Sequence, residues 1–152
     1  RLRLHTRVPI VLPERVDADF CDRLRRSPLT TIVVLHANHA NEFDDTVRRA
    51  CGDLRAAGAT LLNQAVLLAG VNDSVGALTD LSTTSVECGV LPYYLHLLDR
   101  VQGASHFEVA EARALELHGE LRDRLPGYLV PRLVREIAGA SSKTPVRPSG
   151  LD

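Results

Sequence analysis

The chain has 152 residues, of which 45% are hydrophobic and 24% are charged, a composition typical of a soluble globular domain with its own core. Its 18 Lys and Arg residues against 19 Asp and Glu residues give a net charge of −1, and no basic run predicts binding to nucleic acid or to an anionic membrane. The longest apolar runs fall well short of the roughly 20 residues that a membrane span needs. We therefore expect a cytoplasmic protein without nucleic-acid or membrane partners.

Two features of the sequence bear on its processing and its redox state. It begins at Arg1 and contains no methionine, so we expect it to be a fragment of a longer chain. Its three cysteines, Cys21, Cys51 and Cys88, are odd in number and too widely spaced for a CxxC pair. This arrangement predicts buried free thiols rather than a disulfide framework or a zinc site.

Short β-branched apolar runs alternate along the chain with amphipathic segments of helical spacing, which is the pattern of βα units. Because the runs are almost continuously apolar, they predict a parallel sheet that is covered on both faces. The predicted strands are Leu2–His5, Thr31–Leu35, Thr60–Asn63 and Tyr93–Leu98. The predicted helices begin after Asp17, cover Phe43–Ala57 with Gly58 as the stop, lie within Ser74–Glu87 and cover Val109–Arg124.

Four βα units are too few for an eight-unit barrel, which takes at least about 200 residues. The pattern therefore predicts either a small open α/β sheet or part of a larger barrel, and the expected fragment favours the second. After Pro126 an apolar piece, Tyr128–Val134, leads into a small-residue loop and Lys143. We expect one unit over residues 1–145 and a loose tail over residues 146–152.

Polar residues follow the predicted strands, where parallel α/β folds gather their catalytic groups. His36, Gln64 and Asp99 follow the second, third and fourth runs, so we expect them to face one mouth. Each also has a structural alternative: a loop histidine, an amide that satisfies backbone groups at a strand end, or a carboxylate paired with the adjacent Arg100. His96 is expected to point to the opposite face.

Lys143 is the only lysine in a chain with seventeen arginines. A lysine amine can form a Schiff base, whereas the guanidinium of arginine is too basic to supply a free amine. The preceding loop, residues 139–142, consists of small residues that let backbone amides approach a phosphate, but it lacks the GxxxxGK[ST] spacing of a nucleotide loop. The alternative is an ordinary solvated lysine.

Six stretches of the chain are long and specific strings. They are Leu4–Pro9 (LHTRVP), His36–Glu42 (HANHANE), Leu61–Leu68 (LLNQAVLL), Val71–Asp73 (VND), Pro92–Phe107 (PYYLHLLDRVQGASHF) and Gly127–Pro145 (GYLVPRLVREIAGASSKTP). Together they resemble the radical S-adenosylmethionine aminomutases of the lysine 2,3-aminomutase type, from the first residue to about Pro145. The last two strings are most similar to the branch that makes β-lysine for elongation factor P.

The resemblance implies the carboxyl-terminal half of a partial (βα)6 TIM-like barrel of the radical S-adenosylmethionine type. It implies an isomerase that converts L-α-lysine to β-lysine, with pyridoxal 5′-phosphate (PLP), a [4Fe–4S] cluster and S-adenosylmethionine as cofactors. A partner ligase would attach the β-lysine to elongation factor P. The alternatives are a metabolic lysine 2,3-aminomutase and a noncatalytic remnant that binds PLP or a partner.

By position in the resemblance, Lys143 carries PLP, and Asp99 holds the distal ammonium of the substrate lysine. Glu136 stands where the companion aspartate is usual, and His36 and Gln64 contact S-adenosylmethionine. The CxxxCxxC loop that binds the cluster is absent from the sequence. We therefore expect no metal ligand in this chain and no activity from it alone.

Overall fold

The computed structural model describes residues 1–99, 103 and 105–147. Its strands form one six-stranded sheet in the order β1-β2-β3-β4-β5-β6. Neighbouring strands from β1 to β5 are parallel, and β6 runs antiparallel to β5. The strands are β1 (Leu2–Thr6), β2 (Thr31–Leu35), β3 (Thr60–Val66), β4 (Val90–His96), β5 (Arg132–Arg135) and β6 (Thr144–Pro145).

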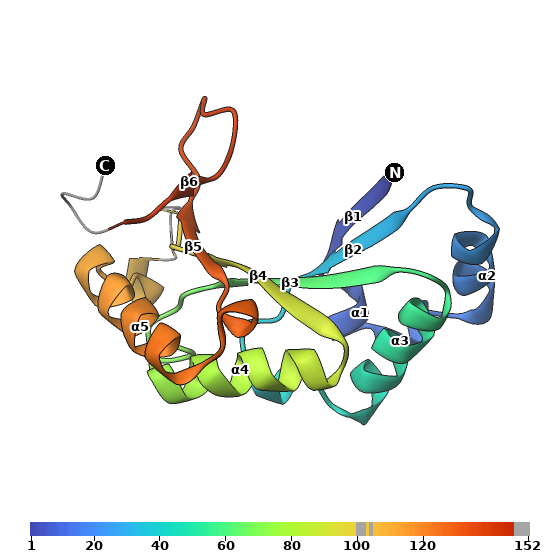
Figure 1. Ribbon diagram of the computed structural model, residues 1–152, viewed down its shortest axis with the longest axis horizontal. Helices are drawn as coiled ribbons and strands as arrows, with labels where there is room; N and C mark the ends of the chain where they lie inside the picture. Colours follow the sequence, from blue (N-terminus) through green and yellow to red (C-terminus); the bar gives the residue numbers. More distant parts are fainter. Residues whose placement is uncertain (100–102, 104, 148–152) are drawn as a thin grey trace.

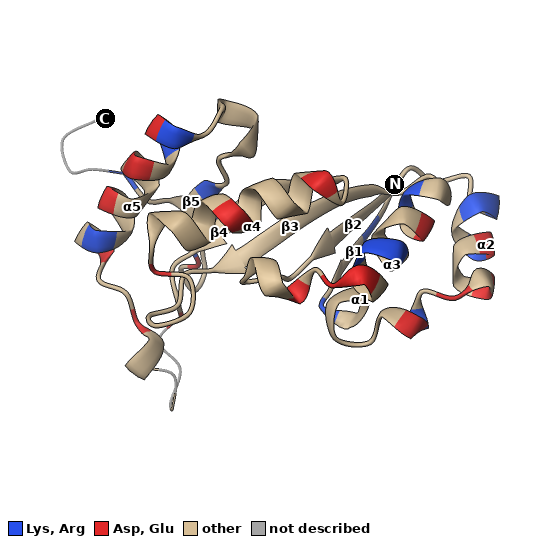
Figure 2. Cartoon of the chain, turned by 90° about the horizontal axis from the view of Figure 1, so that it is seen from below, with Lys and Arg blue, Asp and Glu red and all other residues tan. Residues whose placement is uncertain are grey.

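The helices lie along one side of the curved sheet, and the opposite, inner face of the described residues is open (Figure 1). They are α1 (Val8–Val11), α2 (Ala18–Arg26), α3 (Asp45–Ala56), α4 (Val75–Glu87) and α5 (Glu111–Arg124). Figure 2 shows acidic and basic residues together along α2, α3 and α5. Within the described ranges, no helix has the length and apolar character needed to cross a membrane.

Local capping fixes where the helices begin. The side chain of Asp17 accepts a hydrogen bond from the Phe20 amide at the start of α2, and that of Asp44 accepts from the amides of Thr46 and Val47 at the start of α3. Such caps satisfy backbone N–H groups that have no partner inside the helix. Gly58 follows α3 with a φ of 87°, a conformation that favours glycine. The predicted start of α2 after Asp17 and the predicted stop at Gly58 are therefore confirmed, whereas α3 begins at Asp45 rather than Phe43 and α5 begins at Glu111 rather than Val109.

The core lies between the sheet and the helices, and alternate residues of each strand enter it. In β3, Leu61 and Ala65 are buried under the helices, whereas Gln64 and Val66 face inward and are half-buried. The side chains that are fully buried are mainly leucines: Leu35, Leu54, Leu61, Leu67, Leu78, Leu95, Leu117 and Leu121. The three cysteines are buried free thiols, as predicted, and burial raises the pKa of Cys51 to about 12.

The structure corrects four details of the predicted sheet. The fourth strand, β4, begins at Val90 and ends at His96, not at Tyr93 and Leu98 as predicted. Gln64 lies within β3, which continues to Val66 because Val66 still pairs with His96 of β4. A fifth parallel strand, β5, lies in the apolar piece after Pro126. The sheet is not wholly parallel, because the chain turns back after β5 and pairs as β6.

Part of the expected loose tail, residues 148–152, lies outside the described residues. Val146 is buried, and its amide donates to the Leu133 carbonyl at 3.0 Å. The packed chain thus extends at least to Val146.

Three asparagine side chains join the carboxyl ends of β2 and β3. Asn63 and the backbone of Ala37 exchange two hydrogen bonds of 2.9 Å each. The Asn38 side chain accepts from the Val66 amide, and the amide group of Asn72 donates to the carbonyls of Asn38 and Val66 while its oxygen accepts from Leu68. This amide network fixes the loops that carry the polar residues described below.

Asn72→Ala should lower the free energy of unfolding by at least about 2 kcal/mol, because it removes three hydrogen bonds and leaves buried backbone groups without partners. Asn72 is fully buried. Urea unfolding measures the effect, with Asn41→Ala, a change at an exposed asparagine, as the control. Equal stability of the two variants would contradict the proposed contribution of the amide network to the free energy of unfolding.

Candidate functional site

Polar side chains from successive strands form a row across the inner face of the sheet. The rings of His5 and His36 lie 6.3 Å apart, and those of Tyr94 and His96 lie 5.7 Å apart. Lys143 Nζ lies 5.6 Å from the centre of the Tyr94 ring, and its positive charge contributes to lowering the pKa of His5, His36 and His96. We call the set His5, His36, Gln64, Tyr94, His96 and Lys143 the polar row.

Three members of the polar row have a buried polar atom without a hydrogen-bond partner among the described residues. These atoms are His36 Nε2, Gln64 Oε1 and His96 Nε2. Leaving a buried donor or acceptor unpaired costs about 1–3 kcal/mol, and such groups in a folded protein call for a specific explanation. Their clustering on one open face indicates a surface shaped for a ligand.

The loop after β2 holds His36 in place through its backbone. Arg7, directly after β1, donates to the His36 carbonyl at 2.7 Å and to Glu42 at 2.5 Å. The other carboxylate oxygen of Glu42 accepts from the Asn38 amide at 2.6 Å and from the His39 amide at 3.0 Å. Burial, together with the charges of His5, Arg7 and Lys143, lowers the pKa of His36.

Lys143 is not an ordinary solvated lysine. Its Nζ donates to Oε1 of Glu136 and lies 5.6 Å from the centre of the Tyr94 ring, in the range of a cation–π contact. Its side chain is only 24% exposed. The hydrogen bond and the charge of Lys143 lower the pKa of Glu136, so this carboxylate is ionised at neutral pH.

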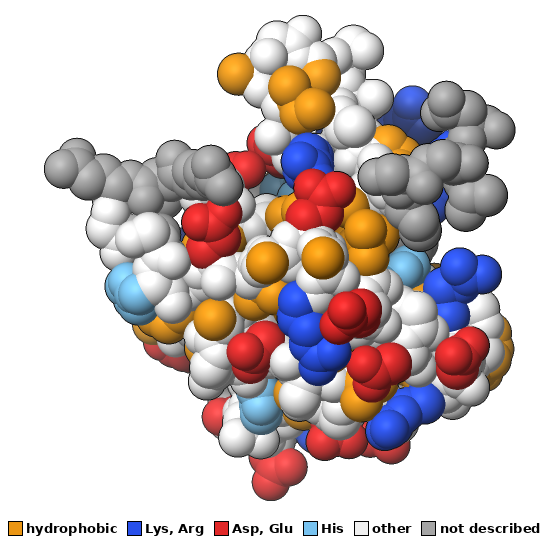
Figure 3. All heavy atoms as spheres, turned by 90° about the vertical axis from the view of Figure 1, so that its left-hand side faces the viewer, with side chains coloured by type: hydrophobic (Ala, Val, Ile, Leu, Met, Phe, Trp, Pro, Cys, Tyr) orange, Lys and Arg blue, Asp and Glu red, His pale blue; other side chains and the backbone are white. Residues whose placement is uncertain are grey.

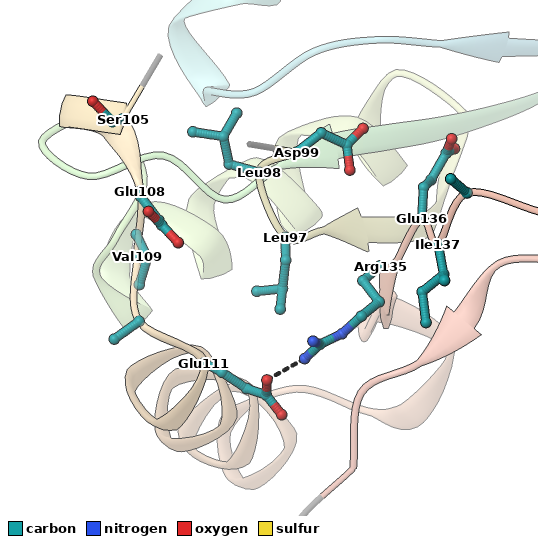
Figure 4. A pocket seen from close by; sticks show the side chains of 12 residues that line it. Leu97, Leu98, Asp99, Ser105, Glu108, Val109, Glu111, Arg135, Glu136 and Ile137 are labelled. Atoms are coloured by element: carbon teal, nitrogen blue, oxygen red, sulfur yellow. Dashed lines mark hydrogen bonds and ion pairs between the residues drawn. The ribbon is translucent and has the colours of Figure 1, made fainter. Parts of the chain in front are cut away.

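A cavity of about 990 Å³ lies beside the polar row, between the loop after β4, the start of α5 and the segment after β5. Asp99 and Glu136 lie on one side of it, while Arg135 reaches across to pair with Glu111 (Figure 4). Figure 3 views this end of the molecule and shows hydrophobic side chains between charged ones beneath the projecting β5–β6 segment. Glu136 thus links the cavity to the polar row, since it lines the first and pairs with Lys143.

The structure therefore brings the predicted site residues into one region. His36, Gln64 and Lys143 belong to the polar row, and Asp99 and Glu136 line the adjoining cavity. Asp99 is exposed. Arg100, its alternative partner, lies outside the described residues.

The prediction that His96 points to the opposite face is wrong. His96 pairs in register with Val66, so it shares the inner face with Gln64, two residues earlier on β3. Its pKa is lowered chiefly by burial and also by Lys143, while Glu136 and Asp99 act in the other direction. The predicted strand reached Leu98, directly before Asp99, but β4 ends at His96, so the alternation of side chains between the two faces does not extend to residue 99.

The polar row fits a carbonyl cofactor such as PLP. It offers a partly buried amine at Lys143 next to an aromatic ring, and unpaired polar atoms further along the same face. The residues that the structure describes contain no group of three His, Cys, Asp or Glu side chains placed to hold a metal ion, so they do not fit an iron–sulfur cluster.

The fold is similar to that of a solved protein that covers most of this chain. A radical SAM methyltransferase from Sphaerobacter thermophilus superposes with a TM-score of 0.59 over 89% of this chain and 40% of its own, at 19% sequence identity. This likeness confirms the predicted α/β class and the partial TIM-like architecture. No family model matches the chain.

The sequence comparison finds relatives with one shared name. The chain is 51% identical over 146 residues to an L-lysine 2,3-aminomutase of Escherichia coli and 50% identical over 144 residues to one of Haemophilus influenzae. The matches cover 96% and 95% of this chain but 43% of each relative. The chain is thus a homologue of proteins named L-lysine 2,3-aminomutase and spans less than half of their length.

The pKa values of His36 and His96 are lowered, so both side chains should titrate below the usual histidine value of about 6.5. The unfolded chain then takes up protons first as the pH falls, so stability should be greatest above that value and decrease below it. Histidine NMR titration measures the first effect, and urea unfolding at a series of pH values measures the second. Titration of either imidazole above the usual value would contradict its burial.

Proposed function

We propose that this chain forms the PLP- and lysine-binding part of an L-lysine 2,3-aminomutase, which converts L-α-lysine to β-lysine. The observation that carries the proposal is the position of Lys143, the chain's only lysine. It sits partly buried between Tyr94 and Glu136 at the end of the polar row. The 51% and 50% identity to proteins of that name supports the same activity.

The chain's own residues have distinct tasks in this proposal. Nζ of Lys143 holds PLP, with Tyr94 covering the amine. His36 and Gln64 present their unpaired Nε2 and Oε1 atoms to S-adenosylmethionine. When bound, PLP supplies an electron-accepting ring at the substrate nitrogen, and S-adenosylmethionine with a [4Fe–4S] cluster held outside this chain supplies the radical.

Asp99 and Glu136 select lysine as the substrate. An ammonium group that enters a partly dry cavity is strongly disfavoured without a partner, and Asp99 and Glu136 are two of the four carboxylates that line this cavity. Glu136 is engaged by Lys143 when no cofactor is present and becomes available once the amine has reacted. The pair then holds the distal ammonium through charge-assisted hydrogen bonds.

The product serves the modification of elongation factor P, through a ligase that attaches β-lysine. The strings 93–107 and 128–145, which resemble that branch of the family, support this assignment. The proposed location is the cytoplasm, where buried free thiols such as those of this chain stay reduced.

Supplying purified β-lysine to cells that lack the protein should restore the modification of elongation factor P. Failure to restore it would favour a metabolic role.

The experiments below use the longest natural polypeptide that contains this chain, called the full-length protein. Borohydride reduction with PLP should fix one pyridoxyl group at Lys143, and Lys143→Arg should abolish the adduct because a guanidinium cannot attack the aldehyde. Mass mapping of peptides locates the group.

The matched control adds Arg147→Lys to Lys143→Arg, which restores an amine four residues away at an exposed position. It should not restore the adduct, since that position lacks the Tyr94 and Glu136 contacts. An adduct on another lysine of the wild-type protein would overturn the assignment.

Asp99→Asn should raise the KM for lysine and lower kcat/KM by at least about 30-fold, because losing one partner of a hydrogen-bonded charge pair typically costs about 2–5 kcal/mol. Glu136→Gln should act in the same direction. The double variant should lose less than the two single losses combined if both carboxylates hold one ammonium. Steady-state kinetics over a range of lysine concentrations measure these effects.

The control for these variants is Asp123→Asn, an exposed aspartate on α5 outside the cavity, which should leave the kinetics unchanged. PLP loading and S-adenosylmethionine binding should survive Asp99→Asn. If this variant weakens S-adenosylmethionine binding as much as lysine binding, Asp99 has a structural role and does not hold the substrate.

A further inference from the structure

We propose that His96 contacts the cofactor that Lys143 carries, and that it does so as an uncharged imidazole through Nε2. The proposal rests on the function proposed above. It assigns a binding role to a residue for which the sequence analysis predicted none.

The position of His96 is fixed from both sides. It is the last residue of β4, and it pairs with Val66 of β3 and with Val134 of β5. Its carbonyl accepts a hydrogen bond from the Leu67 amide at 2.8 Å. The side chain can therefore turn only about its own bonds, and its place on the inner face does not depend on a loop.

The imidazole and the amine of Lys143 both lie beside the ring of Tyr94. Its ring meets the ring of Tyr94 edge-on at 5.7 Å, and Lys143 Nζ lies 5.6 Å from the centre of that same Tyr94 ring. A molecule joined to Nζ that spans the Tyr94 ring can therefore reach His96.

The Nε2 atom of His96 is buried and lacks a hydrogen-bond partner in the described part of the chain. The residue is only 7% exposed, and Nε2 is buried without a hydrogen bond among the described residues. By contrast, Nε2 of His118, on the helix side, lies 2.9 Å from the Pro131 carbonyl. The protein therefore supplies a hydrogen-bond partner to Nε2 of His118 but not to Nε2 of His96. We infer that the partner of His96 Nε2 is a bound molecule.

The charges around His96 suit a neutral ring. Lys143 contributes a positive charge, whereas Glu136 and Asp99 contribute negative ones. Together with burial, this balance keeps the imidazole able to offer one donor and one acceptor rather than two donors. A phosphorylated pyridine with hydroxyl and ring-nitrogen groups, such as PLP, has polar atoms that can pair with either.

The test uses the full-length protein and three variants. His96→Phe keeps a flat ring against Tyr94 but removes Nε2, and His96→Gln returns a polar amide at about the same reach. His118→Phe is the matched control, since it removes a histidine whose partner is the protein itself. Each variant is assayed for the dissociation constant of PLP, the pH dependence of the absorption of bound PLP, and the dissociation constant of S-adenosylmethionine.

His96→Phe should weaken PLP binding about fivefold, as expected for one neutral hydrogen bond, and should shift the pH at which the absorption of bound PLP changes. His96→Gln should recover most of the affinity, and His118→Phe should behave as the wild type. S-adenosylmethionine binding should be the same in all of them.

Wild-type PLP affinity and an unchanged absorption titration in His96→Phe would overturn the proposal, and so would a loss confined to S-adenosylmethionine binding. If His96→Phe does not fold, the NMR signal of the wild-type His96 imidazole should still shift when PLP is added, and an unmoved signal would refute the contact. Failure of the wild-type protein to form the Lys143 adduct would instead reject the proposed function itself.

Discussion

One extra residue in β4 determines which side chains reach the inner face of this sheet. Asn63 of β3 pairs with Pro92, but the next residue, Gln64, pairs with Tyr94, so the ladder skips Tyr93. Side chains alternate between the two faces of a strand, and an inserted residue therefore exchanges the faces of all that follow. Without this β-bulge, Leu95 would face inward and His96 would enter the core beneath the helices.

The bulge works together with the polar clusters around it. The amide network ties the ends of β2 and β3, so Gln64 and the His36 loop are held by buried hydrogen bonds. Lys143 is anchored by Glu136 and by the Tyr94 ring that the bulge has turned inward. The result is a rigid face with unpaired polar atoms, which is the arrangement that a binding site requires before its ligand arrives.

Local signals in the sequence were enough for much of the fold. Asp17 and Gly58 act within a few residues of their own position, and the start of α2 and the end of α3 follow from them. The extent of β3, the antiparallel β6 and the face of His96 depend on pairing with distant strands. No periodicity within one segment reports a bulge, because the register belongs to two strands at once.

The residues of the candidate site likewise fall into those that the sequence indicates and those that only the paired strands reveal. A lone lysine among many arginines, and polar residues after apolar runs, marked Lys143, His36 and Asp99 from the sequence. Gln64 was marked in the same way, as a polar residue after an apolar run, whereas Glu136 came from the family resemblance alone. His96 escaped both approaches, since its only signal is an unsatisfied atom that becomes visible once the strands are paired.

The two edges of the sheet differ in how well a further strand can pair with them. At one end β6 has only two residues, and one of them is Pro145, which has no N–H to donate. At the other end β1 has five residues and, in the described part of the chain, pairs with β2 alone. Among the described residues, a continuous row of unpaired backbone groups lies beside β1, so this is the edge at which a further strand, from the same polypeptide or from another, can join the sheet.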